Sequence, residues 1–237
     1  MNARLFLLAP AAAAVLLSAQ NTGAGIFLQT YTVGTDIPDD SSNGLLNSQT
    51  VAMAEPTITS VSIGLSIDPS PGKSAFLGDL YVYVEHNSAL SVLINRPGRT
   101  ASGLTGYSDN QSLSITLEDG SPDIHGYRVS ASTPLSGSLT GTWGPDGRAT
   151  DPRSVVNTDA RTQPLGAFTG ANANGTWNLF VSDLSGGGAH RLAGWTLSIT
   201  TAAVPEPQVW IAGCGLFAWA GWRGVMASRK RSVPLPQ

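Results

Sequence analysis

The sequence predicts an all-β protein, a β-sandwich or jelly roll, and three observations predict it. Short stretches of alternating apolar and polar residues recur along the chain. Turn sequences separate them, and the 237 residues include 27 Gly and 15 Pro. Between the two ends of the chain, no long stretch repeats its apolar residues with the period of a helix. Short strands joined by turns are the pattern of sandwiches and barrels.

Four stretches alternate strictly enough to predict strands with one buried face. They are VSIGLSI (61–67), LSITL (113–117), GTWNLFVSD (175–183) and GWTLSIT (194–200). Such alternation is typical of an antiparallel sheet with one face in water. Trp177 and Trp195 fall on the apolar faces, so we expect both in the core rather than on a sugar-stacking surface.

Two further stretches are more continuously apolar and predict central strands of the sandwich. They are DLYVYVEH (79–86) and LSVLI (90–94). Tyr81 and Tyr83 share one face of the first stretch. They are better candidates for a ligand-binding surface than the tryptophans, although we expect them mainly to be structural.

The body of the chain is acidic and contains no thiol. All 16 acidic residues lie between Asp36 and Glu206 together with 8 of the 13 basic residues, which gives 8 − 16 = −8. Such a body repels the phosphates of nucleic acids and anionic lipids, so we expect no nucleic-acid partner. The single cysteine, Cys214, lies in the C-terminal apolar stretch, which excludes disulfides and zinc–thiolate sites from the body.

The N-terminal residues have the layout of a secretory signal peptide. One positive charge at Arg4 precedes an apolar run from Leu5 to Leu17, and small residues follow. We predict a signal peptide over residues 1–24, with cleavage after Ala24 favoured over cleavage after Ala19. A membrane anchor is the alternative, but this apolar run is short for a span that needs about 20 residues. The protein is therefore expected to be exported.

The other end of the chain, residues 204–231, combines two prolines, an apolar stretch and a basic cluster. As a helix, residues 208–228 would extend about 30 Å at about 1.5 Å per residue, which is the thickness of a bilayer core. The sequence therefore predicts a transmembrane helix with the body of the chain outside and the basic end in the cytoplasm. The flanking residues are Pro205, Glu206 and Pro207 before the helix and Arg229, Lys230 and Arg231 after it.

In this order, the three features resemble the PEP-CTERM sorting signal of Gram-negative bacteria that make exopolysaccharide. The resemblance implies an exosortase as partner, transient anchoring in the inner membrane, and a final location on the cell surface or outside the cell. Arg223, inside the apolar stretch, departs from the pattern. An ordinary tail anchor is the alternative.

The body, residues 26–201, resembles the P domain, or Homo B domain, of subtilisin-like proprotein convertases. The resemblance is carried by residues 78–98, 113–123 and above all 165–200, where Phe-x-Gly is followed by GTWNLFVSD and GWTLSIT. It is weakest at residues 120–160. The resemblance implies a jelly-roll β-sandwich, which agrees with the strand pattern, and an association with serine endopeptidases.

The sequence shows no catalytic apparatus. The Ser, His and Asp of a subtilisin-like site belong to a catalytic domain that has no counterpart here, and no Gly-x-Ser-x-Gly motif occurs. We expect His86, His125 and His190 to be surface or turn residues, because none has a second histidine at metal-ligand spacing. We therefore expect a protein that is not an enzyme. An unrecognised acidic site that pairs Asp119 with Asp183 is a further alternative.

Three aspartates stand at the ends of predicted strands: Asp79, Asp119 and Asp183. If the sandwich brings these ends together, their oxygens suit a calcium ion. The P-domain resemblance implies the same, because some bacterial P domains hold calcium near similar aspartates. The alternative is that each aspartate caps a turn. The sequence requires no cofactor, and calcium is the one candidate.

Taken together, these observations favour an exported, non-catalytic surface or envelope protein with a P-domain-like binding or structural module. Exopolysaccharide is one candidate partner. The alternative function is that of an accessory module of a subtilisin-like serine endopeptidase, and it follows from the P-domain resemblance.

Overall fold

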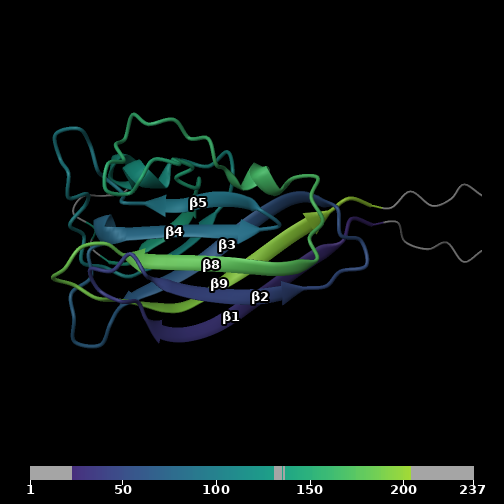
Figure 1. Cartoon of the computed structure of the whole chain (residues 1–237), viewed down its shortest axis with the longest axis horizontal. Coiled ribbons are helices and arrows are strands. Elements are labelled where there is room, and N and C mark those ends of the chain that lie inside the picture. The colour runs from purple at the N-terminus through teal and green to yellow at the C-terminus, as the bar shows by residue number, and fades with distance from the viewer. Residues whose placement is uncertain (1–22, 131–134, 136, 204–237) are drawn as a thin grey trace, which may run out of the picture. The chain divides into compact units, whose positions relative to one another are not determined.

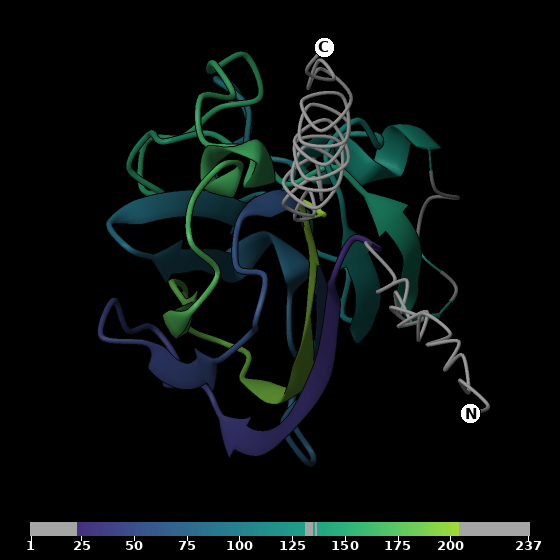
Figure 2. The ribbon, with the colours of Figure 1, turned by 90° about the vertical axis from the view of Figure 1, so that its right-hand side faces the viewer.

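Two β-sheets packed face to face make up the described part of the protein, which is residues 23–130, 135 and 137–203 of the computed structural model. One sheet has the strand order β1-β9-β3-β6-β7 and the other has the order β2-β8-β4-β5. Figure 1 shows the four-stranded sheet in front of the five-stranded one, and Figure 2 shows the ribbon from the right-hand side of Figure 1. The predicted all-β sandwich is confirmed.

The five-stranded sheet consists of β1 (Ile26–Asp36), β3 (Ile58–Pro69), β6 (Leu113–Leu117), β7 (Leu139–Trp143) and β9 (His190–Thr201). The four-stranded sheet consists of β2 (Leu45–Val51), β4 (Leu80–His86), β5 (Ala89–Asn95) and β8 (Gly175–Asp183). The helices are short: η1 (Leu77–Asp79), η2 (Ile124–Gly126), α1 (Tyr127–Ser130) and η3 (Leu165–Phe168).

All six stretches predicted as strands are strands, and the other three strands, β1, β2 and β7, were not among them. The side chains of β2 that point toward the other sheet include the polar Asn47, so the strand lacks an apolar period of two. In β7, Gly141 has a φ of +97° and interrupts the pattern. The β6–β7 pair is also parallel, whereas the other ladders are antiparallel, as the alternation had predicted.

The core between the sheets contains both tryptophans, as predicted. Trp177 is fully buried, and its indole Nε1 donates a hydrogen bond to the Ala173 carbonyl at 3.0 Å. Trp195 is also buried, and its Nε1 donates to the Asn47 side chain at 2.8 Å. A buried indole N–H needs such a partner. This need explains why β2 points a polar residue into the core.

β5 lies at the edge of its sheet rather than in the centre, which corrects the prediction for residues 90–94. Irregular backbone covers this edge: the Asp146 and Gly147 amides donate to Leu93 and Val92, and the Val92 amide donates to Gln163. The cover hides the free edge and shields the side chains of β5. The strand is continuously apolar because of this cover and not because it has a strand on each side.

The predicted terminal features lie outside the described residues. This holds for the sorting residues, for the transmembrane helix (208–228), and for the signal peptide up to residue 22. In the part of the chain that the structure describes, no helix is long and apolar enough to cross a membrane.

Candidate ligand-binding face

The structure brings two of the three predicted aspartates together. Asp79 and Asp183 are neighbours at one end of the sandwich, because Leu80 pairs with Asp183 between β4 and β8. Both carboxylates already have partners. The Arg96 guanidinium lies 3.2 Å from Asp79 Oδ1, and His190 Nδ1 lies 2.6 Å from Asp183 Oδ2.

The third aspartate, Asp119, lies toward the opposite end. His190, which contacts Asp183, pairs with the last residue of β3, whereas Leu117 at the end of β6 pairs with Ile63, six residues earlier on β3. At about 3.3 Å per residue, these positions are roughly 20 Å apart. Asp119 therefore shares no site with the other two aspartates. The alternative of an acidic catalytic pair, Asp119 with Asp183, is wrong for the same reason.

Asp119 holds the start of η3 instead. Its carboxylate accepts hydrogen bonds from the backbone amides of Leu165 at 3.1 Å and Gly166 at 2.6 Å. A carboxylate at this position satisfies amides that the first turn of a helix leaves free. Among the described residues, no three His, Cys, Asp or Glu side chains are grouped so that they could hold a metal ion.

Oxygen atoms surround the Arg96 side chain beside Asp79. Its Nε donates to the Gly78 carbonyl at 2.7 Å, and its terminal nitrogen donates to Ser185 Oγ at 2.8 Å and to Asp79. Burial raises the pKa of the Asp79 carboxyl, the nearby Asp183 charge adds to the rise, and the Arg96 charge opposes it. The Arg96 guanidinium thus supplies a positive charge at the place where the sequence suggested a calcium ion.

The three histidines are buried, which corrects the expectation of surface or turn positions. His86, His125 and His190 are each 1% exposed. The ring of His86 stacks on Trp177 with centroids 4.2 Å apart. Hydrogen-bond partners from other parts of the chain satisfy most of the ring nitrogens of these three histidines. The spacing of residues along the sequence cannot identify such partners.

Both ring nitrogens of His125 have partners, and one of these partners is a carboxylate. Its Nδ1 lies 2.8 Å from Asp146 Oδ2, and its Nε2 lies 2.9 Å from the Arg99 carbonyl. Burial disfavours the imidazolium form, but the hydrogen bond and charge of Asp146 outweigh burial and raise the pKa of His125. Because solvent does not reach this pair, a structural role suits it better than a catalytic one.

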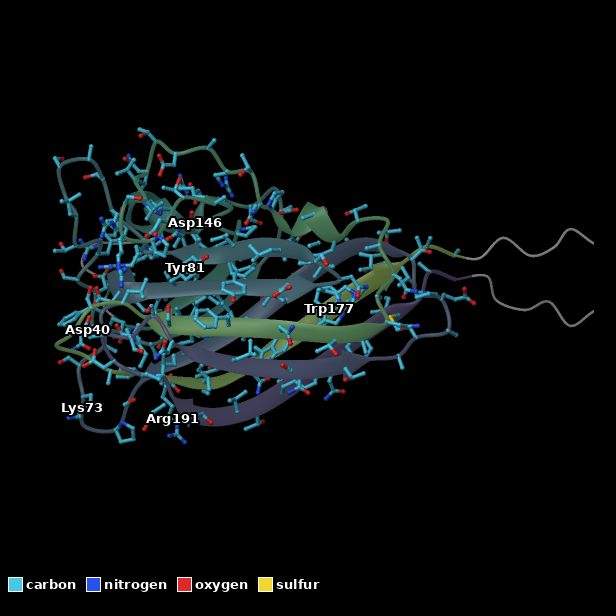
Figure 3. All side chains as sticks on the ribbon, in the orientation of Figure 1. Asp40, Lys73, Tyr81, Asp146, Trp177 and Arg191 are labelled. Carbon is cyan, nitrogen blue, oxygen red and sulfur yellow. The ribbon has the colours of Figure 1, made fainter. Side chains whose placement is uncertain are left out.

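The outer face of the four-stranded sheet carries a row of large apolar side chains. Leu46 of β2 lies opposite Phe180 of β8, and Phe180 lies opposite Tyr83 of β4. Tyr83 stacks on Phe180 with ring centroids 4.8 Å apart, and Tyr81 lies 5.8 Å from Tyr83. We call Leu46, Tyr81, Tyr83 and Phe180 the aromatic face; Figure 3 labels Tyr81.

The local sequence explains why these rings point outward. In β4, Leu80, Val82 and Val84 fill the core, so alternation turns Tyr81 and Tyr83 to the other side. The sequence therefore identified the two tyrosines as surface residues. It missed Phe180, although a signal existed: this residue is an aromatic on the otherwise polar face of its strand.

A hollow of about 190 Å³ lies at one end of the aromatic face. Tyr81 and Phe180 belong to both features. The loop at residues 151–153 contributes Asp151 and Arg153, for which the sequence offered no signal. The residues that line the hollow are Ser42, Tyr81, Asp151, Pro152, Arg153, Phe180, Ser182 and Leu184.

The outer face of the five-stranded sheet differs in chemistry. A shallow trough of about 540 Å³ lies along it, and its outward side chains are small and uncharged. One row across the strands reads Thr30, Thr196, Gly64, Thr116 and Thr142. Small hydroxyl groups in water are the ordinary surface of a wet sheet. The aromatic face is therefore the better candidate for a ligand.

The fold and this face define the protein as an all-β sandwich with an aromatic surface on one sheet. No family model matches the chain, and no curated protein matches it. The chain is similar to the serine protease of Aeromonas sobria, with a TM-score of 0.43, 14% identity, and coverage of 76% of this chain and 27% of that one. It is similar also to the complex of that protease with its chaperone (TM-score 0.42, 15% identity, 77% and 28%). This chain thus spans less than a third of the chains it matches.

Proposed function

We propose that the protein is an exported, non-catalytic binding module that holds an extracellular ligand on its aromatic face. One observation carries the proposal. Three aromatic rings and a leucine that is 58% exposed form a continuous row across β2, β8 and β4. Contiguous apolar patches of this kind mark interaction sites, because leaving them in water costs free energy.

The contrast between the two outer faces supports this proposal. Both belong to sheets of the same molecule, and the residues that line the trough on the five-stranded sheet are mostly Ser, Thr and Gly. The exposed large apolar side chains of that sheet, Ile26 and Leu28, lie on its edge strand β1 and include no aromatic ring. The fold itself therefore does not require rings at such positions. Tyr83 and Phe180 stack on each other on the outer side of strands that are already paired on both edges. A binding role accounts for them better than a packing role does.

The buried ionisable groups support the non-catalytic part of the proposal. Asp79, Asp183 and His125 each make a close contact with an ionisable side chain of the protein, and each is almost fully buried. Catalytic acids and bases need contact with a substrate.

Export and sorting form the second part of the proposal. We infer a P-domain-type jelly roll for the body, secretion by residues 1–24, and recognition of residues 204–231 by an exosortase. Intact mass and peptide mapping of the protein from envelope and medium test this part. We expect a C-terminus at or near residues 204–207. A full-length basic tail found exclusively in membranes would instead indicate a simple anchor.

The binding role is tested by removing apolar surface without touching the core. Polysaccharide prepared from the native host is immobilised, and retention of the wild type is compared with that of a Leu46→Ser/Tyr83→Ser double variant. We expect at least about tenfold weaker retention, because each buried large apolar side chain contributes on the order of 1.5–3 kcal/mol. Thr116→Ala on the other sheet is the matched control and should bind like the wild type.

The protease-accessory role is the second candidate. The sequence block that carries the P-domain resemblance includes Trp177, Leu179 and Trp195, and all three are core residues. The resemblance therefore reflects packing and does not identify a surface for a protease. If a subtilisin-like protease co-purifies from the host, and the double variant no longer captures it, the accessory role would replace binding of polysaccharide.

A further inference from the structure

We propose that the hollow beside Tyr81 and Phe180 binds a single pyranose ring of a neutral sugar. This inference rests on the proposed function and deepens it, because it names the ligand class and the position of one sugar unit. The hollow supplies three things that such a ring needs: an unsatisfied buried hydroxyl, a corner of two aromatic rings, and a donor and an acceptor on its rim.

The unsatisfied hydroxyl belongs to Ser182. This residue is 1% exposed and lines the hollow, and its Oγ has no hydrogen-bond partner among the described residues. Buried hydroxyls without partners are uncommon in native proteins, because the lost contact with water is not replaced. A ligand hydroxyl placed in the hollow would restore the missing bond. None of the other residues that line the hollow has a buried polar side-chain atom without a partner, so Ser182 marks the polar end of the subsite.

Two aromatic rings form a corner of the hollow. The centroids of Tyr81 and Phe180 lie 6.5 Å apart, and the ring planes meet at 65°. Aromatic faces carry partial negative charge and attract the C–H groups of an apolar ring face, with each contact weak by itself. A pyranose has such a C–H face and a polar rim. One aromatic ring can stack on that face while the other meets the edge.

The rim of the hollow provides both a hydrogen-bond acceptor and a hydrogen-bond donor. Asp151 is a pure acceptor when ionised, and Arg153 is a pure donor; both are exposed residues that line the hollow. Sugar hydroxyls both donate and accept, so they can use the two groups together. A proline-rich peptide, the other common partner of aromatic surfaces, presents mainly carbonyl acceptors and leaves Asp151 unmatched.

Charge and size narrow the ligand further. The Asp151 carboxylate and the acidic body disfavour uronates, phosphates and other anions. The hollow, at about 190 Å³, is smaller than pockets for drug-sized molecules and has room for about six water volumes of about 30 Å³. One ring therefore fits, and a longer glycan has to continue over Tyr83 and Leu46.

The test uses the purified full chain in a detergent without a sugar head group. Saturation-transfer difference NMR is recorded with the methyl glycosides of glucose, galactose and mannose, with N-acetylglucosamine, with glucuronate, and with a proline-rich peptide. We expect saturation of at least one neutral pyranoside. Ser182→Ala and Asp151→Asn should each weaken its binding about three- to tenfold. Ser48→Ala, elsewhere on the outer face of the same sheet, is the control and should change nothing.

A second readout separates lost binding from lost folding. Ser182→Ala removes a hydroxyl that has no partner, so the melting temperature should stay the same or rise while affinity falls. The proposal is overturned if no neutral pyranoside is saturated, if glucuronate or the peptide binds better, or if neither variant weakens binding. Tyr83 lies outside the hollow, so Tyr83→Ser should weaken polymer retention but not monosaccharide binding. Polymer retention that depends on Tyr83 but not on Ser182 would overturn this inference and leave the proposed function standing.

Discussion

At the scale of single residues, Arg96 shows how a buried charge is kept in this sandwich. Its φ of +50° is unusual for a residue other than glycine, and its side chain donates to Gly78, Asp79 and Ser185. These bonds hold the guanidinium beside two carboxylates. A strained backbone of this kind persists when the surrounding contacts require it.

Replacing Arg96 should be costly, because Asp79 would lose its countercharge while it stays buried next to Asp183. We expect Arg96→Ala to lower the free energy of unfolding by about 3–5 kcal/mol, measured by urea denaturation. Arg191→Ala is the control: its ion pair with Asp36 is largely exposed, so the loss should be below about 1 kcal/mol.

The same residue bears on calcium. With Arg96 in place, millimolar calcium should leave the melting temperature of the wild type unchanged relative to a chelator, because the guanidinium already occupies the carboxylate oxygen. A clear rise in melting temperature with calcium would contradict this expectation and favour a calcium site at Asp79 and Asp183.

At the scale of elements, the pairing of β1 with β9 depends on a glycine. A Cβ at Gly194 would lie 2.6 Å from the backbone carbonyl oxygen of Tyr31, which is closer than such atoms approach. β1 has β9 as its single partner in the sheet, so a displaced β1 has no second ladder to hold it. Glycine in a strand often marks such a close approach of two backbones.

We expect Gly194→Ala to push β1 away from β9 and to destabilise the protein by about 1–3 kcal/mol. For a domain of this size, the melting temperature should fall by about 2–4 °C per kcal/mol. Gly126→Ala provides the control, because a Cβ there meets no atom within 4 Å and φ is not positive. Equal melting temperatures for the two variants would show that β1 contributes little to the stability of the sandwich.

At the scale of the whole molecule, a buried polar network joins loops that lie far apart in the sequence. His125 contacts Asp146 and the Arg99 carbonyl, and Arg148 contacts both Asp146 and Asp123. Apart from Arg99, these residues lie in the region where the P-domain resemblance was weakest, residues 120–160. Outside β7, packed polar groups rather than regular strands hold the chain together there.

This network should make the stability of the whole protein depend on pH. The pKa of His125 is higher in the folded protein than its unfolded value of about 6.5. Its contribution to stability is therefore complete below about pH 6.5 and is lost as the pH rises through the folded-state pKa. We expect the free energy of unfolding, followed by denaturant titration, to fall between pH 6 and pH 9.

A His125→Gln variant isolates this effect. Glutamine cannot titrate, so the variant should be less stable at pH 6, and the decline toward pH 9 should become shallower than in the wild type. An unchanged slope would assign the pH dependence to other groups.

The sequence by itself determined what depends on local patterning. Alternation placed Trp177 and Trp195 in the core and turned Tyr81 and Tyr83 outward, because successive side chains of a strand point to opposite faces. The same period located four of the strands, continuous apolar runs located two more, and together they indicated the all-β class. Composition determined the acidity of the body and the absence of thiols from it.

The tertiary structure alone decided what depends on partners distant in the chain. Strand register put Asp79 beside Asp183 and separated both from Asp119. Contacts among strands and loops buried the three histidines, and the loop at residues 151–153 completed the hollow. The physical reason is that a side chain's face follows from its own strand, whereas its neighbours follow from how strands and loops meet in space.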